Sequence, residues 1–379
     1  MRQPLLEVDD LRVAVYSERR GLEATRRGES GSGIRLPGDG LELPAGWVQA
    51  IHGVSFAVHP GETLALVGES ASGKSLIVMG ALGLLPSGAI TTGGTTRIEG
   101  YEAQIPQLAV RREEETLRDR ILRKLLPMRP DPVDDPEWRK LMGMRIGVLF
   151  QDPIGSWTPD ILIGEQTAEV LEEHTDLTRE EIRERVFDAL GDVQLPKERK
   201  FLSYRFELSR GEGQRAMLAA ALIKGPDLLI ADEPFSGLDV SVAKAILELI
   251  RDMLTQRKMA MVFVSHDLAA VASIADRVGV VYGGRIVEEG SVRDVFYRPQ
   301  HPYTEGLLAS IPGLDLDRLR PIVGDAPPIT DLPAGCSFAP RCEYAIDVCR
   351  SQRPEPAIEG ETIVSCHRSA ELTLRGVRD

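Results

Sequence analysis

Three absences narrow the class of this chain before any motif is considered. No run of apolar residues approaches the roughly 18 that a membrane-spanning helix needs. The N-terminal residues MRQPLLEVDD lack the apolar core of a signal peptide. Basic residues are outnumbered, with 45 Lys and Arg against 58 Asp and Glu, and the net charge of −13 argues against a nucleic-acid binder. We expect a cytosolic chain that binds no nucleic acid and meets a membrane only through a partner.

Cysteine is missing from the first 335 residues, and four cysteines then follow: Cys336, Cys342, Cys349 and Cys366. In a reducing compartment such a cluster more often binds metal than forms disulfides. Intervals of 5, 6 and 16 residues separate them, without the tight C-x₂₋₄-C knuckle of many zinc sites. Four thiolates suit a tetrahedral Zn²⁺ ion or an iron–sulfur cluster. The wide spacing favours a cluster, while zinc and free or disulfide-linked cysteines stay open as alternatives.

The chain does contain an alternation of strands and helices that is typical of α/β proteins. Its 379 residues, 42% hydrophobic and 27% charged, predict two or three packed globular units. Apolar patterns predict strands at residues 5–16, 47–58, 62–67, 145–151, 227–233 and 259–267, and a strand pair at 278–290. A helix after residue 75 is expected to stop at Pro86. A later helix is expected to bury one face, made of Val242, Ile246, Leu249, Ile250 and Met253.

Two insertions and a tail interrupt this alternation. Residues 17–46, rich in Gly, Arg and Glu, predict an exposed loop. Residues 102–140 predict a charged helix with an apolar stripe, followed by a proline-rich return. Periodicity fades after residue 311, so residues 312–379 are expected to form a small extension that a metal would stabilise. The core domain is therefore placed at 1–311, with a helical part at about 155–225.

The most specific motif is a glycine-bearing loop that fits G-x-x-x-x-G-K-[ST]. It follows the apolar strand and precedes a helix, which is the context that a phosphate-binding loop requires. Its backbone N–H groups and the helix N-terminus can hold phosphate, Lys74 adds a positive charge, and the Ser75 hydroxyl can bind Mg²⁺. The loop consists of Gly68, Glu69, Ser70, Ala71, Ser72, Gly73, Lys74 and Ser75.

Two adjacent acids supply the second half of a predicted ATP site. Asp232 ends the apolar strand LLIAD, where it can hold Mg²⁺ directly or through water. Glu233 follows it and can polarise the attacking water. A strand that ends in two acids is common by itself, but behind a phosphate loop it indicates an ATPase.

With these motifs in this order, the chain resembles the ATP-binding subunits of ABC transporters. Gln151 in VLFQDP is similar to the family's glutamine that senses Mg²⁺ and the membrane partner. Ser209 and Gly211 belong to LSRGE, which stands where the family has LSGGQ. The resemblance implies a P-loop core with a RecA-like subdomain, a helical signature subdomain and an antiparallel β subdomain. It also implies that Ser75, Gln151 and Asp232 hold Mg²⁺ beside ATP.

Three further positions fit the same resemblance. His266 in VFVSHD is similar to the switch histidine, to which the family gives a part in catalysis with Glu233. The segment SGLD at residues 236–239 stands in the place of the D-loop. Tyr16 is similar to the aromatic residue that stacks on adenine, although an exposed tyrosine without a ligand is an equal reading.

The resemblance covers about residues 5–370 and narrows near the C-terminus. The segments FYRPQHPYTEGLLASIP and GCSFAPRCEYAIDVC, followed by SCHR, are similar to those of oligopeptide, dipeptide and nickel importers. That likeness implies a peptide-importer ATPase at the cytoplasmic face of the cell membrane. Its implied partners are a second ATPase subunit in a heterodimer, two permeases and, indirectly, an extracytoplasmic substrate-binding protein. It also implies a [4Fe–4S] cluster on the four cysteines.

One residue departs from the family pattern, because Arg210 replaces a glycine of the signature. A side chain there either blocks the approach of the backbone to the γ-phosphate or adds positive charge to it. Ser209 and Glu212 also fit a capping box, which starts a helix without any transport chemistry. We favour an impaired signature, and hence a heterodimer with one active and one weak ATP site.

A second class of proteins has the same ATPase core. Soluble ABC-type ATPases of DNA repair or regulation share the phosphate loop, and some carry cysteine metal sites. They usually have long coiled coils or two ATPase cores in one chain, and this sequence has neither. The importer reading is therefore preferred.

Overall fold

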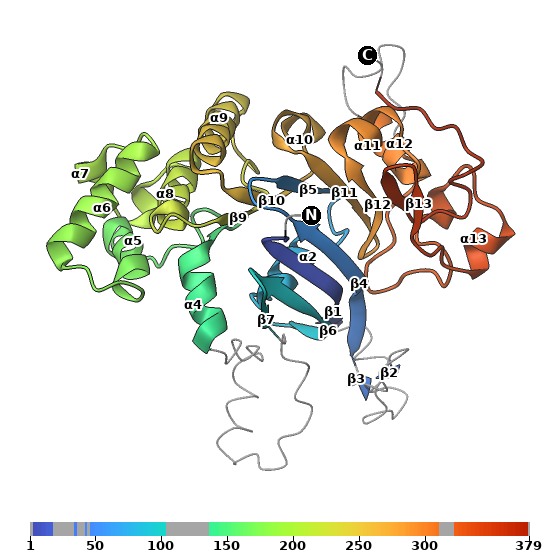
Figure 1. Cartoon of the computed structure of the whole chain (residues 1–379), viewed down its shortest axis with the longest axis horizontal. Helices are drawn as coiled ribbons and strands as arrows, with labels where there is room; N and C mark the ends of the chain where they lie inside the picture. The colour runs from blue at the N-terminus through green and yellow to red at the C-terminus, as the bar shows by residue number, and fades with distance from the viewer. Residues whose placement is uncertain are drawn as a thin grey trace. The chain divides into compact units, whose positions relative to one another are not determined.

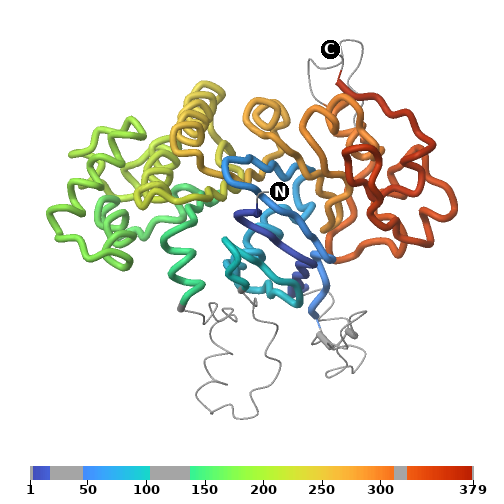
Figure 2. The backbone as a smooth tube through the Cα atoms, viewed as in Figure 1, coloured from blue at the N-terminus to red at the C-terminus, as the bar shows by residue number. Residues whose placement is uncertain are grey.

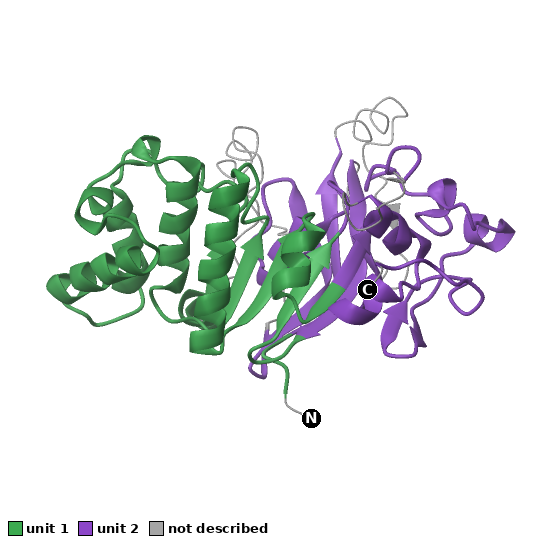
Figure 3. Ribbon diagram, turned by 90° about the horizontal axis from the view of Figure 1, so that it is seen from above, with its two compact units in different colours: residues 1–6, 58–67, 135–278 green, residues 7–57, 68–134, 279–379 purple. Residues whose placement is uncertain are grey.

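The computed structural model describes residues 3–17, 34–35, 42–43, 46–103, 136–310 and 322–377. The chain forms two compact units (Figure 3). Unit 1 comprises residues 1–6, 58–67 and 135–278, and unit 2 comprises residues 7–57, 68–134 and 279–379. The predicted insertion helix lies outside the described residues, as does most of the predicted loop at 17–46. Within the described ranges, no helix combines the length and hydropathy needed to cross a bilayer.

Unit 1 contains a parallel sheet whose strands run in the order β5, β10, β9, β8. These strands are β5 (Thr63–Val67), β8 (Ile146–Leu149), β9 (Leu228–Asp232) and β10 (Ala260–Ser265). Every residue of β5, β9 and β10 is buried, as expected for strands covered on both faces. Asp232 lies opposite Val264, so the carboxyl ends of β9 and β10 meet at one edge of the sheet.

The helices of unit 1 include a group of four that lie together (Figure 1): α5 (Ile163–Glu172), α6 (Arg179–Asp192), α7 (Lys197–Phe201) and α8 (Arg210–Leu222). The remaining helical elements are α4 (Pro136–Arg145), η1 (Arg205–Glu207), α9 (Val240–Arg257) and α10 (Leu268–Ile274). Of the predicted inner face of α9, Ile246, Ile250 and Met253 are buried. The capping box predicted at Ser209 and Glu212 is confirmed at the start of α8.

Unit 2 contains a sheet with the strand order β4, β1, β6, β7. Its strands are β1 (Leu6–Tyr16), β4 (Trp47–Val58), β6 (Ala89–Ile98) and β7 (Tyr101–Ala103), and the short β2 (Ile34–Arg35) pairs with β3 (Glu42–Leu43). The helix that follows the phosphate loop is α2 (Lys74–Leu82). It ends at Gly83, whose left-handed φ of 72° stops it before Pro86, so the predicted stop at Pro86 was wrong.

The later part of unit 2 runs from β11 to β14 (Figure 2). Its elements are β11 (Arg277–Tyr282), which begins in unit 1, β12 (Arg285–Ser291), α11 (Val292–Tyr297), α12 (Pro302–Ala309), η2 (Ala339–Arg341), α13 (Asp347–Ser351), β13 (Ala357–Glu359) and β14 (Thr362–Val364). β14 pairs antiparallel with β12, so the described part of the extension shares a sheet with the core. The domain boundary at 311/312 and the helical part at 155–225 stay predictions.

Candidate functional site

The phosphate loop of unit 2 is folded around its own lysine. The Lys74 Nζ donates hydrogen bonds to the carbonyl oxygens of Gly68 and Glu69, each at 2.9 Å, and the side chain is buried. Gly68 has a φ of 154°, and a Cβ there would lie 2.2 Å from the carbonyl oxygen of Val281, so only glycine fits. The ammonium group is therefore held inside the loop, where a phosphate would meet it.

The helix that starts in this loop has an open N-terminus. Gly73 is the N-cap of α2, and no side chain caps the helix. The first N–H groups of a helix have no partner within the helix, and together they favour an anion. The buried Ser72 Oγ also makes no hydrogen bond within the described part of the chain. These donors fit a phosphate group.

Two residues predicted for catalysis, Glu233 and His266, meet the predicted Mg²⁺ ligand Gln151 in unit 1. The Glu233 carboxylate lies 3.3 Å from the Gln151 Nε2, which donates to it, and 3.5 Å from the His266 Nδ1. Glu233 has a φ of 46°, a left-handed conformation that a non-glycine residue adopts only under constraint. Asp232, the residue before it, is buried at the end of β9. The arrangement can orient the carboxylate toward a water molecule.

The signature turn is closed by its own side chains. The Ser209 backbone N–H and hydroxyl both donate to the Glu212 carboxylate, at 2.9 and 3.1 Å, and the Glu212 N–H donates back to Ser209 Oγ at 3.3 Å. The buried Lys200 forms an ion pair with the same carboxylate at 2.7 Å. Burial alone raises the pKa of Glu212, but the hydrogen bonds from Lys200 and Ser209 outweigh it and lower that pKa. Glu212 is thus held as an anion.

Arg210 folds back within unit 1 against the D-loop. A Cβ added to Gly237 would lie 2.2 Å from the Arg210 Nη1, so the guanidinium group covers this glycine. Arg210 also helps to lower the pKa of Asp152, after the backbone hydrogen bond from Gly155 and that from Ile154. Gly211 is the second residue of α8. The Arg210 side chain therefore links the signature turn to the segments around Gly237 and Asp152.

Tyr16 ends β1 in unit 2 and is half exposed. Its ring lies edge-on to Trp47 with 5.9 Å between the ring centroids. About half of the Tyr16 surface thus stays open to solvent beside Trp47.

The four cysteines line one small cavity of unit 2, and His301, Phe338 and Tyr344 complete much of its wall. None of the four forms a disulfide. Burial raises the pKa of the Cys342 thiol to about 11 and raises those of Cys336 and Cys366 as well. In the described ranges, no three His, Cys, Asp or Glu side chains lie close enough together to hold one metal ion. The cysteines converge, but they are not set for a single ion.

Two contacts of these sites were not predicted from the sequence. Lys200 gives no signal in the sequence, because a lysine at the end of a short charged helix usually faces water. Arg341 lies in the segment that resembles peptide importers, yet its ion pair with Glu69 joins residues 272 positions apart. Only the fold brings such pairs together.

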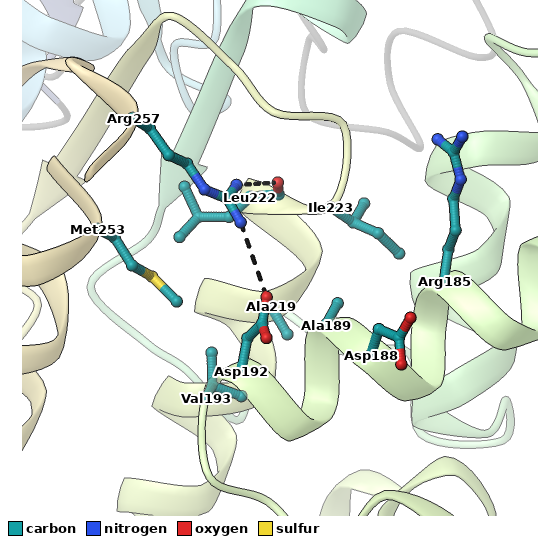
Figure 4. A pocket seen from close by; sticks show the side chains of 10 residues that line it. All are labelled: Arg185, Asp188, Ala189, Asp192, Val193, Ala219, Leu222, Ile223, Met253 and Arg257. Atoms are coloured by element: carbon teal, nitrogen blue, oxygen red, sulfur yellow. Dashed lines mark hydrogen bonds and ion pairs between the residues drawn. The ribbon is translucent and has the colours of Figure 1, made fainter.

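A cavity of about 220 Å³ lies between α6, α8 and α9 of unit 1 (Figure 4). Its apolar wall includes Val193, Leu222 and Met253. At its rim, Arg257 donates to the carbonyl oxygen of Leu222 at 3.0 Å and lies 3.7 Å from the Asp192 carboxylate. None of the predicted site residues lines this cavity, so it is separate from the predicted phosphate chemistry.

Two family profiles match the chain. The profile described as ABC transporter matches residues 51–236, and the one described as oligopeptide/dipeptide transporter, C-terminal region, matches residues 287–349. The second match includes Cys336, Cys342 and Cys349.

Several curated relatives are similar over most of the chain. A putative peptide import ATP-binding protein of Brucella ovis is 39% identical over 83% of this chain and 89% of its own length. The dipeptide transport ATP-binding protein DppD of Bacillus subtilis is 37% identical over 85% and 89%. The oligopeptide transport ATP-binding protein AppD of the same organism is 38% identical over 81% and 87%. These relatives do not favour a DNA-repair ATPase.

Solved structures agree on the fold. An ATP-binding cassette in a dimeric post-hydrolysis state, bound to ADP and Pi, gives a TM-score of 0.54 at 20% identity and covers 76% of this chain and 99% of its own. The cbiO1 protein of Clostridium perfringens gives 0.51 at 22% identity, covering 78% and 91%. The predicted α/β fold with a P-loop core is confirmed.

Proposed function

This chain belongs to the ATP-binding subunits of ABC transporters, in the oligopeptide/dipeptide branch, and from that premise we propose that it powers the import of peptides. It is an ATPase of the transport-coupled class. The observation that carries the proposal is the pairing of an open phosphate loop with a C-terminal region of the peptide-transporter type. The names of the relatives, which specify dipeptides, oligopeptides or peptides, support the substrate class.

In the proposed reaction, the loop from Gly68 to Ser75 binds the phosphates of ATP. Lys74 neutralises part of their charge, and Ser75, Asp232 and Gln151 are the proposed ligands of Mg²⁺. That ion, when bound, offsets the charge that develops on the transferred phosphoryl group. Glu233 accepts a proton from the attacking water, because its side chain is only 14% exposed and its carboxylate is oriented by neighbouring side chains.

His266 and Gln151 hold the Glu233 carboxylate at the start of this step. His266 donates to it only when its Nδ1 carries a proton, and Gln151 donates through its amide. Tyr16 is the proposed platform for adenine. Ser209 and Gly211 are proposed to face the nucleotide of the partner ATPase, as the resemblance implies.

The proposed assembly is a heterodimer of two ATPases on two permeases at the cytoplasmic face of the membrane. An extracytoplasmic binding protein delivers the peptide, and closure of the ATPases on ATP drives the permeases. Support comes from the relatives, which are named as import or transport ATP-binding proteins. Arg210 supports the asymmetry, because it places a long side chain at a signature position where the family has glycine.

The four cysteines are proposed to hold a [4Fe–4S] cluster. The donor set fits, since all four sulfur ligands line one cavity although they are not set for a single ion. When bound, such a cluster would tie together the loops of the extension, which have few regular elements. Anaerobically purified protein is expected to be brown, and each Cys→Ser variant is expected to lose the broad absorbance. Colourless protein with stoichiometric zinc, after expression with ample iron, would contradict the cluster.

The function is tested in proteoliposomes that contain the chain with its copurified ATPase and permeases. We expect ATP hydrolysis to rise when a binding protein loaded with peptide is added, and not when the empty binding protein is added. The importer proposal would be contradicted if the chain purifies without any integral membrane protein and its rate of ATP hydrolysis does not change when peptide is added.

A further inference from the structure

The C-terminal extension reaches the phosphate loop inside unit 2. The guanidinium group of Arg341 donates two parallel hydrogen bonds to the Glu69 carboxylate, Nη1 to Oε2 at 2.7 Å and Nη2 to Oε1 at 3.0 Å. The Arg341 side chain is only 6% exposed. Charge-assisted pairs of this forked geometry are the strongest and most directional that side chains form. Glu69 is therefore fixed by a residue of the extension.

Two more contacts hold the same loop. The backbone N–H of Glu69 donates to the Tyr303 hydroxyl at 2.7 Å, so both ends of this residue are fixed. At the other end of the loop, the Cδ1 of Ile329 lies 2.9 Å from where a Cβ of Gly73 would be. The loop that receives phosphate is thus supported by α12 and by residues beyond it.

Two aromatic residues, Tyr282 and Phe338, also contact Arg341. Its Nη1 also donates to the Tyr282 hydroxyl at 3.2 Å. Its guanidinium carbon lies 5.9 Å from the ring centroid of Tyr282 and 6.0 Å from that of Phe338. These rings restrict the side chain to the direction of Glu69.

The turn that carries Arg341 also forms the wall of the cysteine cavity. Phe338, Ala339 and Cys342 line that cavity, and Arg341 is the neighbour of Cys342 in sequence. The Ala339 N–H donates to the Cys336 carbonyl oxygen at 3.0 Å, and the Cys336 N–H donates to the Cys349 carbonyl oxygen at 2.8 Å. The turn η2, which carries Arg341, is therefore connected through the backbone to the wall of the cysteine cavity.

We propose that the extension clamps the phosphate loop, with Arg341 as a positioning residue for ATP that couples the cysteine cavity to nucleotide affinity. The proposal rests on the proposed function of the loop as the ATP site. Without Arg341, the Glu69 carboxylate faces the bound phosphates uncompensated and repels them. The loop also loses the contact that fixes its first turn.

The test measures binding of a fluorescent ATP analogue to the full purified chain. Arg341→Gln is expected to weaken the affinity about tenfold, within the range typical of coupled sites. Arg341→Lys restores part of the loss, because lysine keeps the charge without the fork. Glu69→Gln in the Arg341→Gln background also restores part, because the uncompensated carboxylate is gone. The matched control is Arg350→Gln, at an exposed arginine of the same extension.

A loop that is merely less stable would not give this pattern of rescue. In the assembled complex, Arg341→Gln is expected to raise the KM for ATP and leave kcat within about twofold. Backbone hydrogen exchange of Gly68 to Ser75 is expected to quicken in this variant and not in Arg350→Gln. Equal affinities in Arg341→Gln and Arg350→Gln would overturn the clamp.

The coupling to the cavity is tested with Cys349→Ser and, at another position of the cavity wall, Cys366→Ser. Each folded variant is expected to bind the analogue several-fold more weakly than wild type. In the Arg341→Gln background, the same substitution is expected to cause no further loss of affinity. Unchanged affinity, or losses that multiply, would overturn the coupling. Wild-type protein that binds the analogue tightly but never hydrolyses ATP in the complex refutes the proposed function and leaves the clamp standing.

Discussion

Two helices of this chain, α2 and α8, differ in whether a side chain caps their N-terminal N–H groups. α2 begins at Gly73 without a side-chain cap, whereas α8 begins at Ser209 with a complete capping box. An uncapped N-terminus keeps donors for an anion, and a capped one uses them internally. The start of α2 therefore suits an anionic ligand, whereas the start of α8 is already capped by its own side chains.

The capping box at the start of α8 fixes the conformation of the signature turn. Because Ser209 and Glu212 bond to one another, the α8 start is preformed, and the Glu212 carboxylate is neutralised by Lys200. Arg210 covers Gly237. The turn is thus rigid and its charges are paired, while the loop at α2 keeps donors for a ligand.

The largest effect is expected at Glu233, the proposed catalytic base. Glu233→Gln should lower ATP turnover in the assembled complex roughly 10²- to 10⁴-fold, because the amide cannot accept the proton of water. Nucleotide binding should persist. Turnover at the wild-type rate would show that another group is the base.

The open start of α2 is tested by Lys74→Ala. We expect affinity for the ATP analogue to fall roughly 10- to 100-fold, since a charge-assisted contact with phosphate is lost. Lys244→Ala, at an exposed lysine of α9, is the control. Similar affinities in the two variants would place the phosphates elsewhere.

The closed start of α8 is tested by Glu212→Gln against Glu181→Gln in the capping box of α6. Each variant loses the carboxylate of its own capping box, but only Glu212→Gln leaves the buried Lys200 without an ionised partner. We expect Glu212→Gln to lower the free energy of unfolding by about 2 kcal/mol and the exposed Glu181→Gln to lower it by much less. Equal losses in urea unfolding would show that Lys200 adds nothing.

A third helix start, that of α12, is capped by His301, whose Nδ1 accepts from the Tyr303 N–H at 3.0 Å. Burial lowers the pKa of His301 to about 3. The unfolded chain takes up this proton below pH 6.5 and the folded chain does not, so His301 stabilises above pH 6.5 and that stability is lost as pH falls toward 3.

The measurement compares wild type with His301→Asn, whose amide oxygen can accept the same hydrogen bond. Between pH 7.5 and 5.5, wild type should lose about 1.4 kcal/mol relative to the variant. Burial raises the pKa of nearby Glu288 to about 7, which acts in the opposite direction in both proteins and cancels in the difference. A difference that is constant with pH would mean that His301 is not buried in its neutral form.

The smallest effect is expected at Arg210. Arg210→Gly should change the ATPase rate of the complex by about two- to tenfold, because it frees the signature backbone and uncovers Gly237. The site affected should be that of the partner's nucleotide, which mutation of each subunit's catalytic glutamate can separate. Two equally active sites in wild type would contradict the proposed asymmetry.

The sequence was sufficient for most of the local structure. The strands at β1, β4, β9 and β10 and the capping box of α8 follow from periodicity and from the preferences of single residues. The roles of Gln151 and His266 were predicted from the resemblance to ABC transporters and that of Glu233 from its place behind the phosphate loop, and these roles stay predictions; the fold does bring the three side chains together. The end of α2 was misplaced, since a glycine in the left-handed conformation stops a helix earlier than the next proline.

Contacts between distant residues could not be predicted. The ion pair of Lys200 with Glu212 and the pair of Arg341 with Glu69 depend on how loops return to the core. In the sequence, neither Lys200 nor Arg341 differs from an ordinary exposed basic residue. The four cysteines were predicted to converge because they were expected to hold one metal group, but the cavity that they line required the fold.

The position of Arg341 also has a consequence for synthesis on the ribosome. Glu69 is synthesised 272 residues before its partner Arg341. At translation rates of about 5–20 residues per second, that interval is roughly 14–54 s. Until Arg341 has been made, the nascent phosphate loop has no clamp, and this state lasts for most of the synthesis of the chain. The edge of β12 (Arg285–Ser291) is unpaired only from its own synthesis until β14 (Thr362–Val364) follows. An unclamped loop and, later, an unpaired strand edge are states in which chaperones are expected to hold the nascent chain.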